Sequence, residues 1–245
     1  MTSREARLTR QHAFEPVKTP SLGAAVWQIV RKDWTVEARS REIAYTTLFF
    51  AVSCLLVFAF AIVRDGRAPE GAGEGILWAT LTFAGTLALG RTFERERQAE
   101  TLRALLLAPV PRAAVYLGKL VGVVSLLLAL ELILAPLVTL LFAAPLLSRP
   151  IWLLAILLTG TLGFAAVGTL SAAMLVRARS RDVLLPVLLY PVVVPVLIAG
   201  VRGTSAIIAP EFDAAVARFW LALLLAFDAV FVTLALWTFE LVMAE

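Results

Sequence analysis

The sequence is poor in the residue types that carry catalysis and metal binding. It contains one histidine and one cysteine among 245 residues, and only 16% of its residues are charged. A lone cysteine, Cys54, excludes a disulfide within the chain, and a lone histidine, His12, disfavours a histidine-based metal site. No nucleophile stands beside a matching base, and no cofactor-binding loop is present. We therefore expect neither an enzyme nor a metalloprotein.

Long apolar runs dominate the rest of the chain. Hydrophobic residues make up 60% of it, and the mean hydropathy is +0.88. A helix needs about 20 apolar residues to cross a bilayer. The runs that meet or approach this length are 43–63, 75–91, 113–140, 151–176, 183–201 and 219–243. They predict an all-α, multi-pass membrane protein with six transmembrane helices, of which the fifth is kinked or broken by Pro186, Pro191 and Pro195. We expect outer loops at about 64–74, 144–150 and 202–217.

Lysine and arginine are distributed unevenly between the connecting segments. Seventeen of the 22 fall in residues 1–42, 91–119 and 177–181, and five fall in the alternate loops. Cytoplasmic segments carry the excess of positive charge in membrane proteins, so both termini are predicted to lie in the cytoplasm. Because topology explains the pI of about 9.7, the basic charge is no argument for nucleic-acid binding.

The segment before the first span divides into a tail and a helix. Residues 1–20 lack the apolar core of a signal peptide, so we expect a disordered cytoplasmic tail followed by a single domain over 21–245. Residues 22–42 have helical periodicity, with a broad apolar face and a narrower basic one. This pattern, with Trp27 and Trp34 seven residues apart, predicts a helix lying on the cytoplasmic membrane surface.

Three charged residues interrupt the apolar face of that helix. Asp33, Glu37 and Arg41 follow one another at intervals of four residues. They form either a solvated ladder of ion pairs, worth a few tenths of a kcal/mol per pair, or a row of contacts for a partner protein. The spacing does not decide between the two.

Residues 93–108 form the most polar stretch between two spans. They are good helix formers, charged in the first half and apolar in the second, and Pro109 and Pro111 end them. A charged helical elbow suits a membrane protein that receives force from a soluble partner. The chain cannot supply that force, because its only Gly-Lys pair, Gly118-Lys119, lacks the surrounding residues of a Walker A loop.

The surface helix, the elbow FERE…TLRALLLAPVPR and the stretch AVYLGKL at 114–120 resemble the cytochrome c maturation protein B family. This family supplies the ABC-2 type permease subunit of a "haem exporter" complex in the bacterial inner membrane, and the resemblance covers residues 22–245. It implies an ABC ATPase subunit, other cytochrome c maturation membrane subunits and a haem chaperone as partners, and a homodimer or a paired permease. ATP hydrolysis by the partner would be coupled to haem export or to release of the haem-loaded chaperone.

The resemblance also implies two sets of ATPase-interface residues. One set lies on the surface helix and the other on the elbow, which would act as a coupling helix. They are Lys32, Asp33, Glu37 and Arg39, and Glu94, Arg95, Glu96 and Glu100. Family members often have glycine near position 100, which weakens the assignment of Glu100.

Two carboxylates fall inside predicted spans. A charged carboxylate there costs several kcal/mol unless it is paired, protonated or hydrated. Glu131 either lines a cavity or a partner-binding groove, or bonds a neighbouring helix in its protonated form, and Asp228 raises the same question. The fourth span also carries a row of small residues, for which helix packing is the expected role. They are Thr159, Gly160, Thr161, Gly163, Gly168 and Thr169.

The residue types that usually hold haem iron are scattered along the chain. Met174 and the three tyrosines are expected near membrane edges, and no two suitable residues are arranged for axial bonds. We therefore expect no tightly bound cofactor on this chain, with haem confined to the complex and ATP to the partner subunit. Two alternatives stay open: an ABC-2 permease for another substrate, such as a lipid-linked glycan or a drug, and a non-conducting assembly scaffold.

Overall fold

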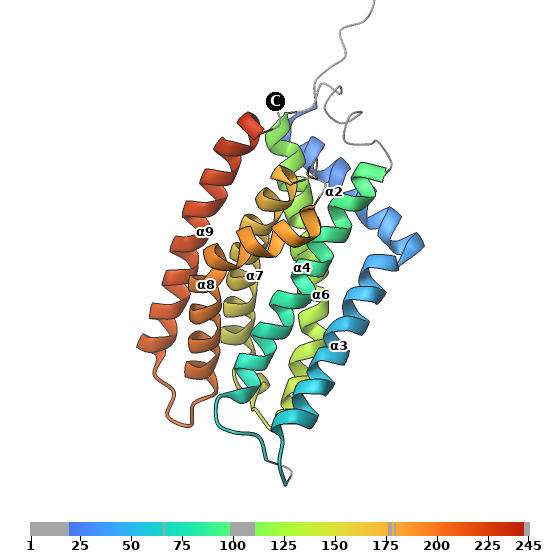
Figure 1. Cartoon of the computed structure of the whole chain (residues 1–245). Coiled ribbons are helices and arrows are strands. Elements are labelled where there is room, and N and C mark those ends of the chain that lie inside the picture. Colours follow the sequence, from blue (N-terminus) through green and yellow to red (C-terminus); the bar gives the residue numbers. More distant parts are fainter. Residues whose placement is uncertain (1–19, 66, 99–110, 176–177, 179, 243–245) are drawn as a thin grey trace, which may run out of the picture.

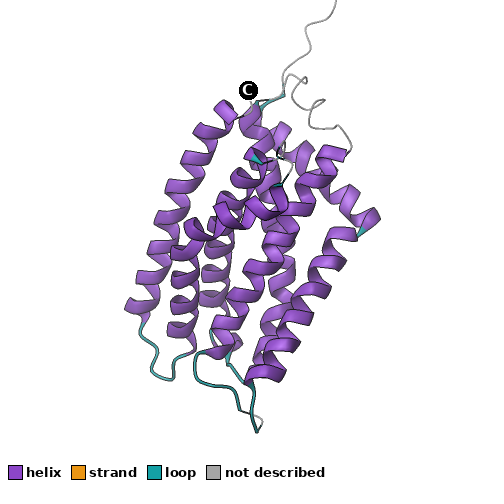
Figure 2. Cartoon of the chain, viewed as in Figure 1, coloured by secondary structure: helices purple, strands orange, loops and turns teal. Residues whose placement is uncertain are grey.

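The computed structural model describes residues 20–65, 67–98, 111–175, 178 and 180–242. Over these residues the chain is a bundle of long helices with short connections (Figures 1 and 2). The helices are α2 (Leu22–Ser40), α3 (Glu42–Ile62), α4 (Ala72–Gln98), α6 (Arg112–Phe142), the 3-10 helix η1 (Leu146–Ser148), α7 (Pro150–Met174), α8 (Arg181–Ile208) and α9 (Ala214–Val242). Six of them, α3, α4 and α6 to α9, are long and apolar enough to cross a membrane. The predicted all-α fold with six spans is confirmed.

A tight corner at Arg41 separates the surface helix from the first span. Arg41 adopts a left-handed conformation with φ of 53°, and its N–H donates to the carbonyl of Glu37 at 2.6 Å. The Glu37 carboxylate accepts the N–H of Ala44 at 2.8 Å and thereby caps the start of α3. The chain thus turns sharply, and α2 lies across the end of the bundle at an angle to α3 (Figure 1). We call this end of the molecule the α2 end.

Helix α7 is the centre of the bundle. It contacts α4, α6, α8 and α9, and its glycines let neighbouring side chains approach its backbone. Gly160 lies against the indole of Trp78, Gly163 against the carboxylate of Asp228 and Gly168 against Leu89. The packing role predicted for this row of small residues is confirmed. Helices α3 and α9 lie at opposite edges of the bundle (Figure 1).

Helix α8 is longer than predicted. It bends strongly along its length, as its three internal prolines led us to expect, and its first part crosses the bundle toward α4 (Figure 1). It continues to Ile208, so the predicted outer loop 202–217 is wrong in its first part. The reason is Arg149, whose Nη1 donates to the carbonyl of Ile207 and, at 3.5 Å, to that of Ala209. These bonds satisfy carbonyls that the end of a helix leaves without partners.

Helix α4 also extends beyond its predicted span of 75–91. It starts at Ala72 and its backbone remains helical to Gln98. The first, charged half of the predicted elbow is therefore a continuation of the second span and not a separate helix. Residues 99–108, the remainder of that elbow, lie outside the described residues.

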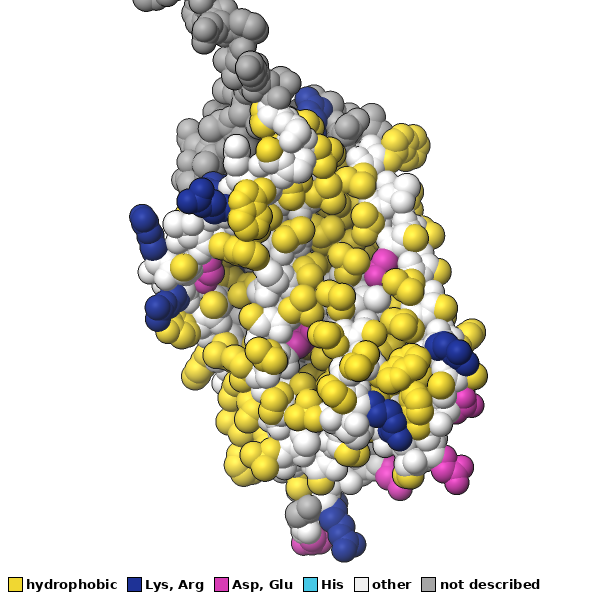
Figure 3. Space-filling model, turned by 180° about the vertical axis from the view of Figure 1, so that it is seen from behind, with side chains coloured by type: hydrophobic (Ala, Val, Ile, Leu, Met, Phe, Trp, Pro, Cys, Tyr) yellow, Lys and Arg dark blue, Asp and Glu magenta, His cyan; other side chains and the backbone are white. Residues whose placement is uncertain are grey.

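The surface of the bundle fits a lipid environment. Hydrophobic side chains cover most of the middle of the face seen in Figure 3, and the charged side chains visible there lie mainly toward its ends and edges. Large aromatic side chains such as Phe49, Phe60 and Trp237 are exposed on the surface of the bundle, as expected where the surface faces lipid and not water. The chain is a multi-pass membrane protein.

Candidate functional site

Helix α2 is docked on α6 by close packing. Its buried residues Ala25, Ile29 and Val30 face the bundle. A methyl group added to Gly118 of α6 would lie 2.7 Å from Cγ2 of Ile29, which leaves no room for a larger residue at position 118. Gly118 therefore sets the close approach of the two helices.

A buried ion pair joins the same two helices. Nζ of Lys119 lies 2.8 Å from Oδ2 of Asp33, and their side chains are 5% and 20% exposed. Nζ of Lys32 lies 3.3 Å from the other carboxylate oxygen of Asp33. A solvated ladder along α2 was one interpretation of Asp33, and it is wrong because this carboxylate faces α6 and is largely buried. The attraction between two charges is stronger where water is excluded, although the free-energy cost of removing both charges from water offsets part of it.

A side-chain hydrogen bond also fixes the position of α2. Nε1 of Trp34 donates to Oγ of Ser125 on α6 at 2.9 Å. Within α2, the rings of Trp27 and Trp34 meet edge to face with centroids 6.2 Å apart. Arg39, in the last turn of α2, is exposed. Of the four interface residues predicted on this helix, Asp33 and Glu37 thus hold the fold together, while Lys32 and Arg39 lie on its more accessible side.

The structure places only part of the predicted coupling helix. Glu94, Arg95 and Glu96 belong to the last turns of α4, beyond the end of the apolar segment at Thr92. Glu100 lies outside the described residues. The backbone therefore carries Glu94 and Glu96 beyond the apolar span, on a helix that is continuous with a membrane span.

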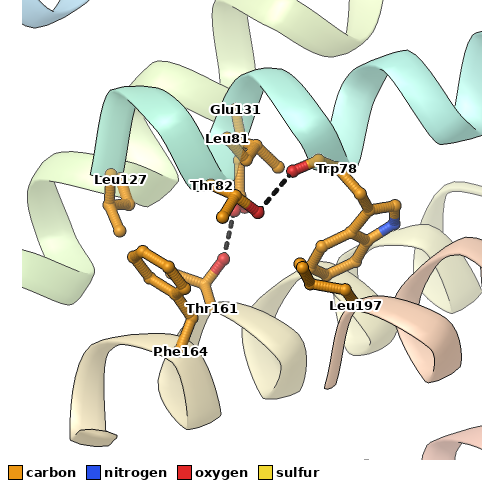
Figure 4. A pocket seen from close by; sticks show the side chains of 8 residues that line it. All are labelled: Trp78, Leu81, Thr82, Leu127, Glu131, Thr161, Phe164 and Leu197. Atoms are coloured by element: carbon orange, nitrogen blue, oxygen red, sulfur yellow. Dashed lines mark hydrogen bonds between the residues drawn. The ribbon is translucent and has the colours of Figure 1, made fainter. Parts of the chain in front are cut away.

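Glu131 lies in the middle of the bundle, where it is 2% exposed. The hydroxyl of Thr161 on α7 donates to Oε1 of Glu131, and Oε2 makes no hydrogen bond to the described residues. Figure 4 shows this pair between Trp78 and Leu197 on one side and Phe164 and Leu127 on the other. The hollow that these side chains line has a volume of about 10 Å³, which holds about one water molecule.

Trp78 connects α4 to both α7 and α8. Its Nε1 donates to Oγ1 of Thr204 on α8 at 3.0 Å, and its ring lies between Gly160 of α7 and Gly200 of α8. A methyl group on Gly200 would lie 2.5 Å from Cε2 of Trp78. This arrangement makes the half of the bundle away from the α2 end a closely packed unit, with Glu74 accepting a hydrogen bond from Ser205 at 2.7 Å.

Asp228 lies on the other side of α7. Its side chain is buried, neither carboxylate oxygen has a hydrogen-bond partner in the described residues, and it rests on Gly163. Glu131 and Asp228 are thus separated by α7 and do not form one site.

Tyr116 and Tyr190, two residues of a type that can hold haem iron, lie on different parts of the bundle. Tyr116, expected near a membrane edge, is fully buried, and its hydroxyl donates to the carbonyl of Ala166 at 3.1 Å. Tyr190 packs against Phe83 on another part of the bundle. Within the described residues no three His, Cys, Asp or Glu side chains form a group suited to a metal ion.

Comparison with known proteins agrees with this architecture. The family model described as "CcmB protein" matches residues 24–244. A heme exporter protein B from Paracoccus denitrificans is 35% identical over 158 residues, which cover 63% of this chain and 70% of that protein. Proteins of the same name from Pseudomonas aeruginosa and Rhodobacter capsulatus are 29% identical over 163 residues and 34% identical over 153 residues. These matches cover 66% and 62% of this chain and 72% and 69% of the two relatives. The chain therefore belongs to the CcmB protein family.

Proposed function

We propose that this chain is the permease subunit of an ABC complex for cytochrome c biogenesis in the bacterial inner membrane. A separate ATPase subunit would hydrolyse ATP, and the permease would couple this to haem export or to release of a haem-loaded chaperone. Support comes from relatives that carry the name heme exporter protein B. The chain would have no catalytic role of its own.

The docking of α2 on α6 is the observation that carries the coupling role. The pair Asp33–Lys119, the hydrogen bond from Trp34 to Ser125 and the contact of Ile29 with Gly118 fasten α2 at three successive points. A push on α2 would therefore be passed to α6, a helix of 31 residues that reaches the opposite end of the bundle. The excess of lysine and arginine at the α2 end supports a cytoplasmic position for it.

The second contact surface for the ATPase would be the end of α4. Glu94 and Glu96 lie where the helix has left the apolar span, and α4 is tied to α7 and α8 through Trp78. We propose that the partner contacts Lys32 and Arg39 on α2 together with Glu94, Arg95 and Glu96 on α4. The first surface is on α2, which packs on α6, and the second is at the end of α4, whose other end is packed within the bundle.

The small hollow at Glu131 supports a role in transmission rather than in conduction through the middle of the described bundle. A ligand of haem size needs a site of several hundred Å³, whereas the hollow beside Glu131 measures about 10 Å³. If haem moves, its route in this proposal runs between subunits or along their surfaces. A scaffold without coupling would not need the ion-paired link between α2 and α6.

Deleting the gene tests the proposal. We expect c-type cytochromes in the deletion strain to lose covalently bound haem, seen by haem staining of denatured membrane proteins, and the wild-type gene on a plasmid to restore it. Total haem and the b-type cytochromes, which bind haem without a covalent bond, should stay unchanged and serve as the control. Normal c-type cytochromes in the deletion strain would contradict the proposal and favour an ABC-2 permease for another substrate.

A further inference from the structure

A hollow of about 500 Å³ opens between α3, α4 and the first part of α8. It exists because α8 crosses the bundle before it bends, so that its first turns lie over the end of the apolar part of α4 (Figure 1). Its volume is that of a small-molecule site, in contrast to the hollow at Glu131. The proposed function uses none of its lining residues.

The end of the hollow nearest the α2 end is basic. Arg91 is one residue from the end of the apolar segment of α4, and its side chain is 43% exposed. Arg181 begins α8, and its Nη2 donates to the carbonyl of Gly90 at 3.3 Å, which holds its guanidinium against the wall of the hollow. Asp182 also lines this end, and one of its carboxylate oxygens lies 3.5 Å from Nε of Arg181.

The other end of the hollow is apolar and aromatic. Phe50 of α3 and Phe83 of α4 line this end, and their side chains are exposed. Tyr190 of α8 packs edge to face on Phe83 with ring centroids 6.3 Å apart, and its hydroxyl lies 3.5 Å from that of Thr86. A molecule in this hollow would therefore meet positive charge at the level of the membrane surface and apolar rings below it.

We propose that the hollow binds an anionic phospholipid from the membrane leaflet at the α2 end. The phosphate would lie on Arg91 and Arg181, and an acyl chain would follow Phe50 and Phe83 toward the middle of the bilayer. Basic pockets between transmembrane helices bind anionic headgroups in this way. Guanidinium groups form two parallel hydrogen bonds to a phosphate. In a headgroup with no net charge, the headgroup's own ammonium group weakens this interaction.

The existing contacts of Arg91 do not compete strongly with a phosphate. Its Nη1 lies 3.7 Å from Oε1 of Glu42, and both side chains are well exposed. Ion pairs of this kind contribute little, so Arg91 can turn to the phosphate while Arg181 stays anchored on Gly90. The lipid would thereby join α3, α4 and α8 at the point where α4 leaves the membrane.

Lipid retention by the purified full-length protein tests this site. The protein would be placed in nanodiscs of phosphatidylglycerol and phosphatidylcholine in equal amounts, released into the gas phase, and its retained lipids identified by native mass spectrometry. We expect one phosphatidylglycerol per chain to be retained in preference to phosphatidylcholine. Arg91→Gln should lower this preference about fivefold, the effect of one basic side chain near a membrane surface, and Arg91→Lys should lower it less.

Arg218→Gln is the matched control, because Arg218 is an exposed arginine near the start of α9 and outside the hollow. It should leave the preference unchanged. Equal retention of the two lipids by the wild type, or an unchanged preference in Arg91→Gln, would overturn the proposal.

Discussion

Replacing Asp33 with asparagine is expected to lower the free energy of unfolding by about 3 kcal/mol, the size of the loss when one member of a buried ion pair is removed. Lys119 would keep its positive charge at a position where only 5% of its side chain is exposed. Lys119→Met should cost less, because Asp33 is itself 20% exposed and still has Lys32 at 3.3 Å. The double variant Asp33→Asn, Lys119→Met should recover most of the loss, since it leaves neither charge buried.

Unfolding in mixed micelles with increasing SDS, followed by circular dichroism, would give these free energies as a double-mutant cycle. Lys32→Met serves as the control, because its pair with Asp33 is more exposed and should be worth less than about 1 kcal/mol. If the double variant loses as much as the two single variants together, the two residues act independently. The ion pair would then not be the link between α2 and α6.

Replacing Glu131 is expected to separate the two interpretations of this carboxylate. Glu131→Gln keeps an oxygen that accepts the hydrogen bond of Thr161, so stability and covalent haem on c-type cytochromes should remain close to wild type. Glu131→Ala should lower the free energy of unfolding by about 2–4 kcal/mol, because it empties a closely packed site and leaves the Thr161 hydroxyl without its acceptor.

The same SDS titration and haem stain would measure both effects, with Thr139→Ala, a partly buried α6 threonine that bonds only its own helix, as the control. The small hollow around Glu131 favours the structural role. Loss of covalent haem in a well-folded Glu131→Gln variant would instead show that the carboxylate itself takes part in function, as a residue that lines a cavity would.

The spans could be predicted from the sequence because hydrophobicity and length decide them. Each observed helix lies within about five residues of its predicted range, except α4 and α8. Helix α4 runs on into the charged segment, whose residues are good helix formers. The end of α8 is held by the bonds that Arg149 makes to its last carbonyls, and this contact involves a residue far away in the sequence, which a pattern along one helix does not contain.

The docking of α2 was not predictable from the spacing of its charges. Asp33 interrupts the apolar face of α2, and this signalled a role, but its partner Lys119 is 86 positions away. Gly118 and Lys119 form an incomplete nucleotide-binding loop and belong to the stretch that marks the family resemblance, and neither feature indicates a contact with α2. Trp78 gave no signal beyond an aromatic in a span, since its position between Gly160 and Gly200 follows from the packing of three helices.

We propose that a partner ATPase drives this chain through contacts on α2 and on the charged end of α4. The most direct test is haem staining of c-type cytochromes in the deletion strain that carries Glu94→Ala, Glu96→Ala, with the amount of this chain in the membrane measured in the same samples. We expect the variant protein to insert normally, because both residues lie beyond the apolar span. We also expect the c-type cytochromes to lose most of the covalent haem that the wild-type gene restores. Full restoration of haem by this variant, at equal protein level, would contradict the claim.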